Sequence, residues 1–224
     1  MLAAPMKSAR FVGRPAALLG LGAVLAVVAF QLWVTPSNPP GYHRDEAALS
    51  YNAYSIATTG RDEYGGVMPL FFRSYGDYKS PLYPYVLAAV FRVTGPHKEV
   101  ARAFSAVLIA LAVLLLGLLA KAVTGRTVVG VAVIVIAGVT PWLFELGRVA
   151  LEVATQPLLV TLLLLALHRA WRRQTWTARE GAVIGLLLGL LLYSYTGSRL
   201  LAPLPRTEEL GPSRHTGTIT PRTP

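Results

Sequence analysis

The sequence predicts an all-α integral membrane protein with about five transmembrane helices. Of its 224 residues, 54% are hydrophobic and only 14% are charged, whereas a soluble domain usually carries about 25% charged residues. The charges are unevenly spread, because uncharged stretches of about 18 residues or more recur, each long enough to cross a bilayer core of roughly 30 Å. These observations exclude a soluble globular enzyme and an intrinsically disordered chain.

Charge and cysteine content narrow the class of protein further. The chain has no cysteine, which excludes a disulfide framework and a thiolate metal site. Its 21 lysines and arginines exceed its 11 acidic residues, and in a membrane protein such an excess more often sets topology than binds nucleic acid. There is no P-loop, dinucleotide fingerprint or HExxH motif, and four scattered histidines lack metal-ligand spacing. The sequence therefore predicts no nucleic-acid partner and no cofactor, and it gives no support for a divalent metal.

Five apolar segments make up the predicted transmembrane domain, which follows a short cytoplasmic amino terminus, residues 1–14. The first segment ends in the interfacial Trp33 and is too long for the apolar core of a signal peptide, so we expect it to remain uncleaved. Prolines lie near the ends of later segments, where a broken backbone bond is cheapest to satisfy. The predicted spans are residues 15–34, 103–120, 127–144, 153–171 and 181–198.

A long loop, residues 35–102, separates the first two spans. It opens with a proline-rich stretch that excludes helix. Asp45–Thr59 has helical spacing, with Gly60 as its carboxyl-terminal cap. Pro81–Gly95 is apolar but contains Arg92 and is short for a span, so its composition alone allows it either to cross the membrane or to lie on it.

Topology resolves this choice. If Pro81–Gly95 lies in the interface, the amino terminus, the Lys121–Arg126 turn and the 169–179 loop share one side, and short basic segments of this kind are typical of the cytoplasm. If it spans, the arginine-rich loop is placed outside. We therefore predict an interfacial helix and an outer face that gathers Asp45, Glu46, Asp62, Glu63, Asp77 and Glu152.

Polar residues on this outer face are candidates for chemistry. Asp45 and Glu46 begin a helix, where an acid also serves as an amino-terminal cap. Because neighbours on a helix diverge by about 100°, at most one of them faces a site squarely, where it could take a proton from a hydroxyl or amine. Lys79 and Arg73 lie in an aromatic-rich run and could hold a phosphate that reaches up from the membrane, or simply reach ordinary lipid headgroups.

Two spacings in the later spans predict helix contacts. Arg148 and Glu152 lie four residues apart between the third and fourth spans, for which an i,i+4 salt pair is the default. Gly185–Gly189 fits a face on which small residues let two membrane helices pack closely.

An acid pair just past the first span, followed by AYSIATTGRDEYG, PLFFRSYGDYKSPLYPY and a later VAR, resembles a family of membrane enzymes. These are the polyprenyl-phosphate-dependent GT-C glycosyltransferases of family 39 and their relatives, which include protein O-mannosyltransferases and the lipid A aminoarabinose transferase. The resemblance runs from about residue 15 to residue 204. It implies a GT-C-like fold with two juxtamembrane helices in the first outer loop. It also implies sugar transfer from a polyprenyl-phosphate carrier to a protein, lipid or glycan acceptor, at the extracytoplasmic face of a plasma membrane that we expect to be bacterial.

The resemblance also implies catalytic roles for three acids. Asp45 and Glu46 match the DE motif of the family, so Asp45 would act as general base in a single inverting displacement, supported by Glu46. Glu152 falls where the family places the acid of its second outer loop, and it would orient the acceptor or the base.

Donor-phosphate binding is implied for three cations. Lys79 matches a lysine associated with the lipid phosphate, and Lys79 and Arg148 would stabilise the leaving phosphate as its charge grows. Arg73 is the third candidate. Tyr78 replaces the metal-associated acid that precedes this lysine in the aminoarabinose transferase, and Asp77 is out of register with it, so the resemblance predicts no metal here.

The resemblance covers only an amino-terminal portion, since family members are more than twice this length. Residues 205–224 form a tract rich in Pro, Thr, Arg and Gly, which we predict to be a disordered, aberrant tail. Further spans would complete the lipid groove, so we expect little or no transfer from these 224 residues alone. A catalytically dead membrane fragment is the alternative. A transporter fragment is disfavoured, because the spans lack the buried ionisable residues that transport requires.

Overall fold

The computed structural model describes residues 14–33, 38–173 and 176–201. This part of the chain is mostly helical, with one antiparallel two-stranded hairpin, in agreement with the predicted all-α class. Its elements are α1 (Arg14–Trp33), α2 (Arg44–Thr59), β1 (Phe72–Ser74), β2 (Asp77–Lys79), α3 (Leu82–Thr94), α4 (Lys98–Thr124), α5 (Thr127–Val139), α6 (Pro141–Arg148), the 3₁₀ turn η1 (Glu152–Ala154), α7 (Thr155–Trp171), α8 (Ala178–Leu192) and the 3₁₀ segment η2 (Thr196–Leu201).

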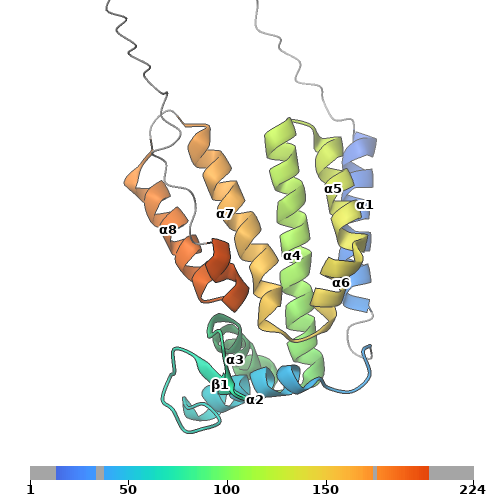
Figure 1. The fold of residues 1–224 in the computed structure, drawn as a ribbon. Coiled ribbons are helices and arrows are strands. Elements are labelled where there is room, and N and C mark those ends of the chain that lie inside the picture. Colours follow the sequence, from blue (N-terminus) through green and yellow to red (C-terminus); the bar gives the residue numbers. More distant parts are fainter. Residues whose placement is uncertain (1–13, 34–37, 174–175, 202–224) are drawn as a thin grey trace, which may run out of the picture.

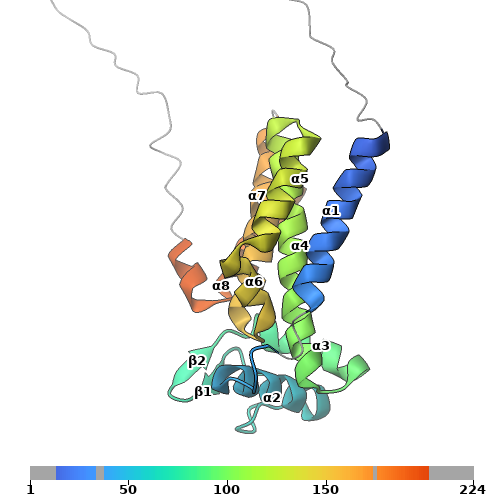
Figure 2. The same cartoon turned by 90° about the vertical axis from the view of Figure 1, so that its right-hand side faces the viewer.

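The helices form an upright bundle above a crossing layer. Helices α1, α4, α5, α7 and α8 stand side by side, whereas α2, the hairpin and α3 lie across the lower end (Figures 1 and 2). Helix α4 is central, since it packs against α1, α5, α6 and α7. The crossing layer has its own apolar core, in which α2 contributes Leu49 and Ala53 and α3 contributes Tyr83 and Leu87.

Local sequence explains the ends of α2. His43 caps its amino terminus in a capping box with Glu46, so the His43 side chain accepts a backbone hydrogen bond while Glu46 reaches back to the His43 N–H. Gly60 ends the helix in the left-handed conformation, with a φ of 70°, which glycine adopts at little cost. The structure thus confirms the helix and the cap that were predicted here.

The predicted spans correspond to helices of unequal length. Two segments, Lys98–Thr124 and Glu152–Trp171, are long and apolar enough to cross a membrane, and α5 with α6 makes a third if the bent pair is one span. The predicted span 127–144 is therefore broken, with a bend of 59°, because Pro141 at the start of α6 has no N–H to continue the ladder of α5. Helices α1 and α8 occupy the two other predicted spans. Helix α8 has 15 residues, about 22 Å of helix. Neither α8 nor α1 is among the segments found long and apolar enough to cross, so the crossing of both remains a prediction.

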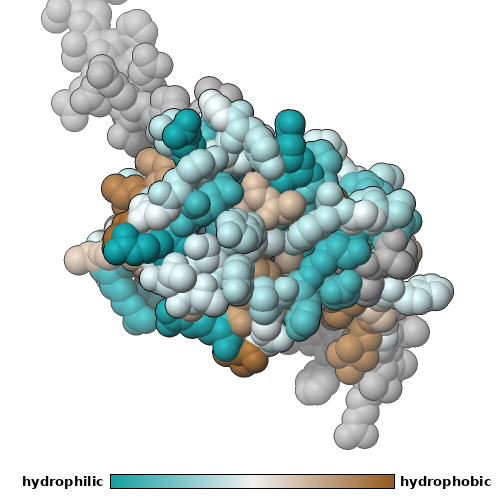
Figure 3. Space-filling view, turned by 90° about the horizontal axis from the view of Figure 1, so that it is seen from below, coloured by the Kyte–Doolittle hydropathy of each residue, from teal (hydrophilic) through white to brown (hydrophobic). Residues whose placement is uncertain are grey.

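The two ends of the bundle differ in charge. The α4–α5 turn, Lys121–Arg126, and the connection from α7 to α8 lie at the upper end, whereas α2, the hairpin and η1 lie at the lower end (Figure 1). Seen from below, the crossing layer presents a largely hydrophilic surface (Figure 3). The acids of the predicted outer face and the basic turns thus lie at opposite ends, the arrangement on which the topology argument depends. That the lower end is extracytoplasmic remains a prediction.

Glycines mark one close helix contact and one open helix face. A Cβ at Gly117 would lie 2.3 Å from the Ile134 side chain and 2.8 Å from the Gly130 carbonyl oxygen, so α4 and α5 approach closely only because these positions lack side chains. Gly185 and Gly189 differ, because a Cβ there would meet nothing within 4 Å. The packing face predicted for α8 therefore has no partner helix among the described residues.

Candidate functional site

Three segments meet at the lower end of the bundle and bring polar side chains together. They are the first turn of α2, the strand β2 and the turn η1. The Lys79 Nζ lies 3.9 Å from Asp45 Oδ1 and 3.5 Å from Asp77 Oδ2. The charges of Lys79, Asp77 and Asp45 all act on the Glu152 carboxylate. The structure therefore gathers Asp45, Lys79 and Glu152, which are far apart in the sequence, into one cluster.

The Asp45 carboxylate is available for chemistry. His43 provides the helix cap, since its Nδ1 accepts the Asp45 N–H at 3.3 Å, so Asp45 does not itself cap the helix as the alternative interpretation proposed. Its side chain is 33% exposed and that of Lys79 is 20% exposed. An accessible carboxylate next to an accessible ammonium can serve both proton transfer and anion binding.

Glu152 is buried but not saturated. Its residue is 7% exposed, and its Oε2 atom has no hydrogen-bond partner. The turn that carries it is fixed by Thr155, whose hydroxyl donates to the Glu152 backbone carbonyl at 2.7 Å. A buried carboxylate oxygen without a donor is costly, so this atom has an unused capacity to accept a hydrogen bond.

Glu46 is placed differently from its neighbour, because it is fully buried against Arg102 of α4. Its Oε1 receives hydrogen bonds from Arg102 Nε at 3.0 Å and from the Ala150 N–H at 2.8 Å. Its Oε2 receives bonds from Arg102 Nη2 and the His43 N–H, both at 2.9 Å. Burial by itself would raise the pKa of Glu46, but the bonds from Arg102, Ala150 and His43 outweigh it and hold that pKa below its usual value. The structure thus assigns this predicted catalytic acid to a saturated internal contact.

Arg102 received no role in the sequence analysis. It ends the VAR motif, Val100–Arg102, just before the second predicted span, where a lone arginine resembles an ordinary interfacial anchor. Besides binding Glu46, it donates from Nη1 to the Pro39 carbonyl at 2.7 Å and from Nη2 to the Gly41 carbonyl at 2.9 Å. The motif was the available signal, but a contact across 56 residues cannot be deduced from local spacing.

The expected salt pair between Arg148 and Glu152 is wrong. Helix α6 ends at Arg148, and Val149 is extended, with φ −118° and ψ 142°, so the two residues do not share a helical face. Arg148 instead donates to Glu145 Oε1 at 3.0 Å and to the Asn38 carbonyl at 3.2 Å, and it packs over the Phe144 ring. It remains at the lower end but is anchored apart from Glu152.

Arg73 is not brought to Lys79 either. In the hairpin Arg73 pairs with Tyr78 and Lys79 pairs with Phe72, so the two cations point to opposite faces of the sheet. The Arg73 guanidinium lies over the Tyr64 ring, 5.2 Å from its centroid. The structure therefore separates this predicted phosphate ligand from the cluster.

A cleft of about 700 Å³ lies between the hairpin and the carboxyl-terminal end of α8, next to the cluster. Phe71 stacks on Tyr193 across it, with ring centroids 5.9 Å apart, and the Tyr193 carbonyl accepts the Leu82 N–H at 3.3 Å. Its lining also includes Asp77, the second acid beside Lys79. The residues that line it are Phe71, Asp77, Tyr78, Leu192, Tyr193 and Thr196.

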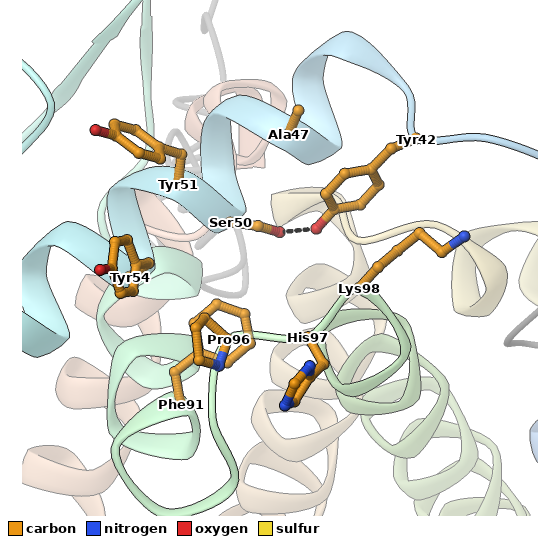
Figure 4. A pocket seen from close by; sticks show the side chains of 9 residues that line it. All are labelled: Tyr42, Ala47, Ser50, Tyr51, Tyr54, Phe91, Pro96, His97 and Lys98. Carbon is orange, nitrogen blue, oxygen red and sulfur yellow. Dashed lines mark hydrogen bonds between the residues drawn. The ribbon is translucent and has the colours of Figure 1, made fainter.

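A second, aromatic cleft of about 370 Å³ lies between α2 and the start of α4 (Figure 4). The Tyr42 hydroxyl donates to the Ser50 hydroxyl at its edge. Ala47, Ser50 and Tyr54 point about 140–200° away from Asp45 around α2, so this cleft is separate from the cluster. Its lining comprises Tyr42, Ala47, Ser50, Tyr51, Tyr54, Phe91, Pro96, His97 and Lys98.

No group of three or more His, Cys, Asp or Glu side chains that could hold a metal ion occurs in the described part of the chain. Residues 78–204 match a protein-family model described as dolichyl-phosphate-mannose-protein mannosyltransferase. The matched segment includes Lys79, Arg148 and Glu152 and begins after Asp45 and Glu46. No curated protein and no solved structure matches the chain.

Proposed function

The chain belongs to the dolichyl-phosphate-mannose-protein mannosyltransferase family, and on that premise we propose that it transfers a sugar from a polyprenyl-phosphate carrier to an acceptor at the extracytoplasmic membrane face. The family is one of integral membrane glycosyltransferases of the GT-C type, to which the helical fold and its apolar helices conform. The observation that carries the proposal is the convergence of Asp45, Lys79 and Glu152 at one end of the bundle. That end has a hydrophilic surface, as Figure 3 shows.

Lys79 is the proposed ligand of the carrier phosphate. Its two acidic neighbours lie at 3.5 and 3.9 Å, longer than the 2.7–2.9 Å of a close charge-assisted hydrogen bond, so the ammonium can turn to a better acceptor. A phosphate at the membrane surface provides one. Arg148, at the same end, is the proposed second cation, whereas Arg73 is left out because the hairpin directs it away.

Asp45 and Glu152 are proposed to handle the acceptor. The acceptor oxygen or nitrogen attacks the anomeric carbon of the sugar while the bond from that carbon to the phosphate oxygen breaks. The electron pair of the broken bond leaves with the polyprenyl phosphate, next to Lys79, and the acceptor proton passes to Asp45. Glu152 Oε2, which has no donor, would accept a hydrogen bond from the acceptor and orient it.

Binding of a short-chain prenyl phosphate to the detergent-solubilised chain tests the donor site. We expect Lys79→Met to weaken binding at least about tenfold, because a charge-assisted contact of about 1.5–3 kcal/mol is lost. Lys121→Met removes the same charge at the opposite end and should leave the affinity unchanged. Equal affinities of the two variants would contradict the proposed donor site.

The base is tested by turnover in a chain completed with the further spans of the family, because little transfer is expected from these 224 residues alone. Asp45→Asn keeps the shape of the side chain but removes the base, so transfer should fall by roughly 10²-fold or more. Glu152→Gln should also lower transfer. The matched control is Arg61→Gln, which affects only an exposed bond to the Gly65 carbonyl and should change transfer little. Near-normal turnover of a correctly inserted Asp45→Asn protein would show that another group is the base.

A further inference from the structure

The buried Glu46–Arg102 pair connects the two segments that carry the acids of the proposed site. Glu46 directly follows Asp45 in α2, and its Oε1 accepts the N–H of Ala150, two residues before Glu152. Its other oxygen accepts the His43 N–H, at the cap of α2. One carboxylate thus fixes the start of α2 to the segment that leads into η1.

Arg102 connects this carboxylate to the centre of the bundle. It lies in α4, which packs against most of the other upright helices, and neither charged side chain of the pair is exposed. Its Nη1 and Nη2 also donate to the Pro39 and Gly41 carbonyls, so the residues just before α2 are fixed as well. Three segments of the lower end are therefore tied to a single guanidinium.

The hydrogen bonds of Glu46 leave it no capacity for chemistry. An ionised carboxylate has about four lone-pair sites, and four donors already occupy them at 2.8–3.0 Å. An acceptor or a donor sugar would have to displace one of these bonds. The second acid of the Asp45-Glu46 motif therefore does not act as a proton acceptor.

We infer that Arg102 is a positioning residue for the transfer reaction: through Glu46 it holds Asp45 at a fixed distance from Glu152. The inference rests on the proposed function, in which these two carboxylates handle the same acceptor. Transfer needs the base and the acceptor to be held within about 1 Å of the productive geometry. A guanidinium suits this task because its planar fork presents two parallel N–H groups to one carboxylate, which lysine cannot do.

Spin-label distances in the 224-residue chain test the positioning directly. The chain has no cysteine, so Arg44→Cys with Val153→Cys provides two clean sites, one beside each acid. We expect a narrow distance distribution in the otherwise unchanged chain and a distinctly broader or shifted one with Arg102→Lys. Arg173→Lys, in the ion pair with Glu180 at the opposite end, is the matched control and should leave the distribution narrow.

Kinetics distinguish positioning from a purely structural role. In the completed chain, Arg102→Lys should lower kcat at least about tenfold, while the KM for the donor changes less than about threefold, because Arg102 touches neither substrate. Arg102→Met should lower kcat further if that variant folds, and Arg102→Lys supplies the test if it does not.

An unchanged distance distribution, or an unchanged kcat, in Arg102→Lys would overturn the inference. The distance measurement does not depend on donor binding. If Lys79→Met left donor binding intact, the proposed function would be contradicted. The spin-label distances would still show whether Arg102 fixes the start of α2 relative to η1.

Discussion

Asp45 and Glu46 are adjacent in the sequence, yet they occupy two contrasting regions of the molecule. Glu46 lies in a closed region, without exposure and with four donors at 3.0 Å or less. Asp45 lies in an open region, 33% exposed, with its nearest lysine at 3.9 Å. In the proposed site the two acids therefore have different roles, because the Glu46 carboxylate is saturated by internal donors whereas the Asp45 carboxylate is accessible.

Helix geometry explains why the division occurs within one turn. Neighbouring residues of a helix diverge by about 100°, so when Glu46 points towards Arg102 in the bundle, Asp45 must point along its flank, where β2 brings Lys79. The same rotation explains why exchanging the two acids would not preserve the site. The contrast leads to predictions that differ in size between the closed and the open region.

The largest expected effect is on stability and is confined to the closed region. Arg102→Met leaves the Glu46 carboxylate buried without its main partner and should lower the free energy of unfolding by about 3–5 kcal/mol. Lys79→Met breaks only partly exposed pairs and should cost about 1 kcal/mol or less. Unfolding in mixed micelles with increasing SDS measures both. Similar losses from the two variants would mean that the two regions do not differ as the contacts indicate.

The pH dependence of unfolding tests the buried charge of Glu46 in the closed region. Because the folded protein holds the pKa of Glu46 below its ordinary value of 4.5, the charged side chain stabilises the fold above about pH 4.5, and this contribution is lost as the pH falls through the lower, folded pKa. Glu46→Gln should therefore be less stable than wild type at pH 7, and its unfolding temperature should fall less steeply below pH 4.5.

Arg102→Met should reverse the direction in which Glu46 makes the stability of the fold depend on pH. Without the guanidinium, burial dominates and raises the pKa of Glu46, so the variant should recover part of its stability as the pH falls and Glu46 takes up a proton. Unfolding temperatures between pH 7 and pH 3 provide the measurement. Parallel curves for wild type and Arg102→Met would show that Arg102 does not control the charge of Glu46.

Much of the fold was accessible from the sequence, because it depends on local patterns. Apolar runs of sufficient length gave the upright helices, and the spacing of Asp45–Thr59 with Gly60 gave α2 and its end. The placement of short basic turns gave the end of the bundle that carries the excess of positive charge. Each of these depends on residues within about one helical segment of one another.

The features that were missed depend on breaks and long-range contacts. The spacing of Arg148 and Glu152 predicted a salt pair only if the helix continued through Val149, and it does not. Arg73 and Lys79 lie in one aromatic-rich run, but strand alternation places them on opposite faces. The Arg102–Glu46 contact joins residues 56 positions apart, so no local pattern could reveal it. Asp45, Lys79 and Glu152 could therefore be nominated from the sequence, but the contact of Arg102 and the division into closed and open regions required the structure.

The smallest expected effect concerns Asp77, at the edge of the open region. Its side chain is 73% exposed, with Oδ2 3.5 Å from Lys79 Nζ, and its Oδ1 accepts the Tyr78 N–H at 2.7 Å. Asp77→Asn keeps an oxygen for that backbone bond and removes only the charge. The proposed carrier phosphate should then bind about twofold more tightly, since an exposed pair is worth at most about 1 kcal/mol.

Salt shows whether this gain is electrostatic. In about 1 M NaCl, where the Debye length is about 3 Å, Asp77→Asn and wild type should bind the phosphate with the same affinity. By contrast, Arg102→Met should remain less stable than wild type in high salt, because salt screens the buried Glu46 charge poorly. Titration with a short-chain prenyl phosphate at low and high salt measures the affinities. The control is Glu99→Gln, which removes the charge of another exposed acid near the lower end. Weaker binding by Asp77→Asn would mean that Asp77 holds Lys79 in place for the phosphate. The open region would then share the fixed geometry of the closed one.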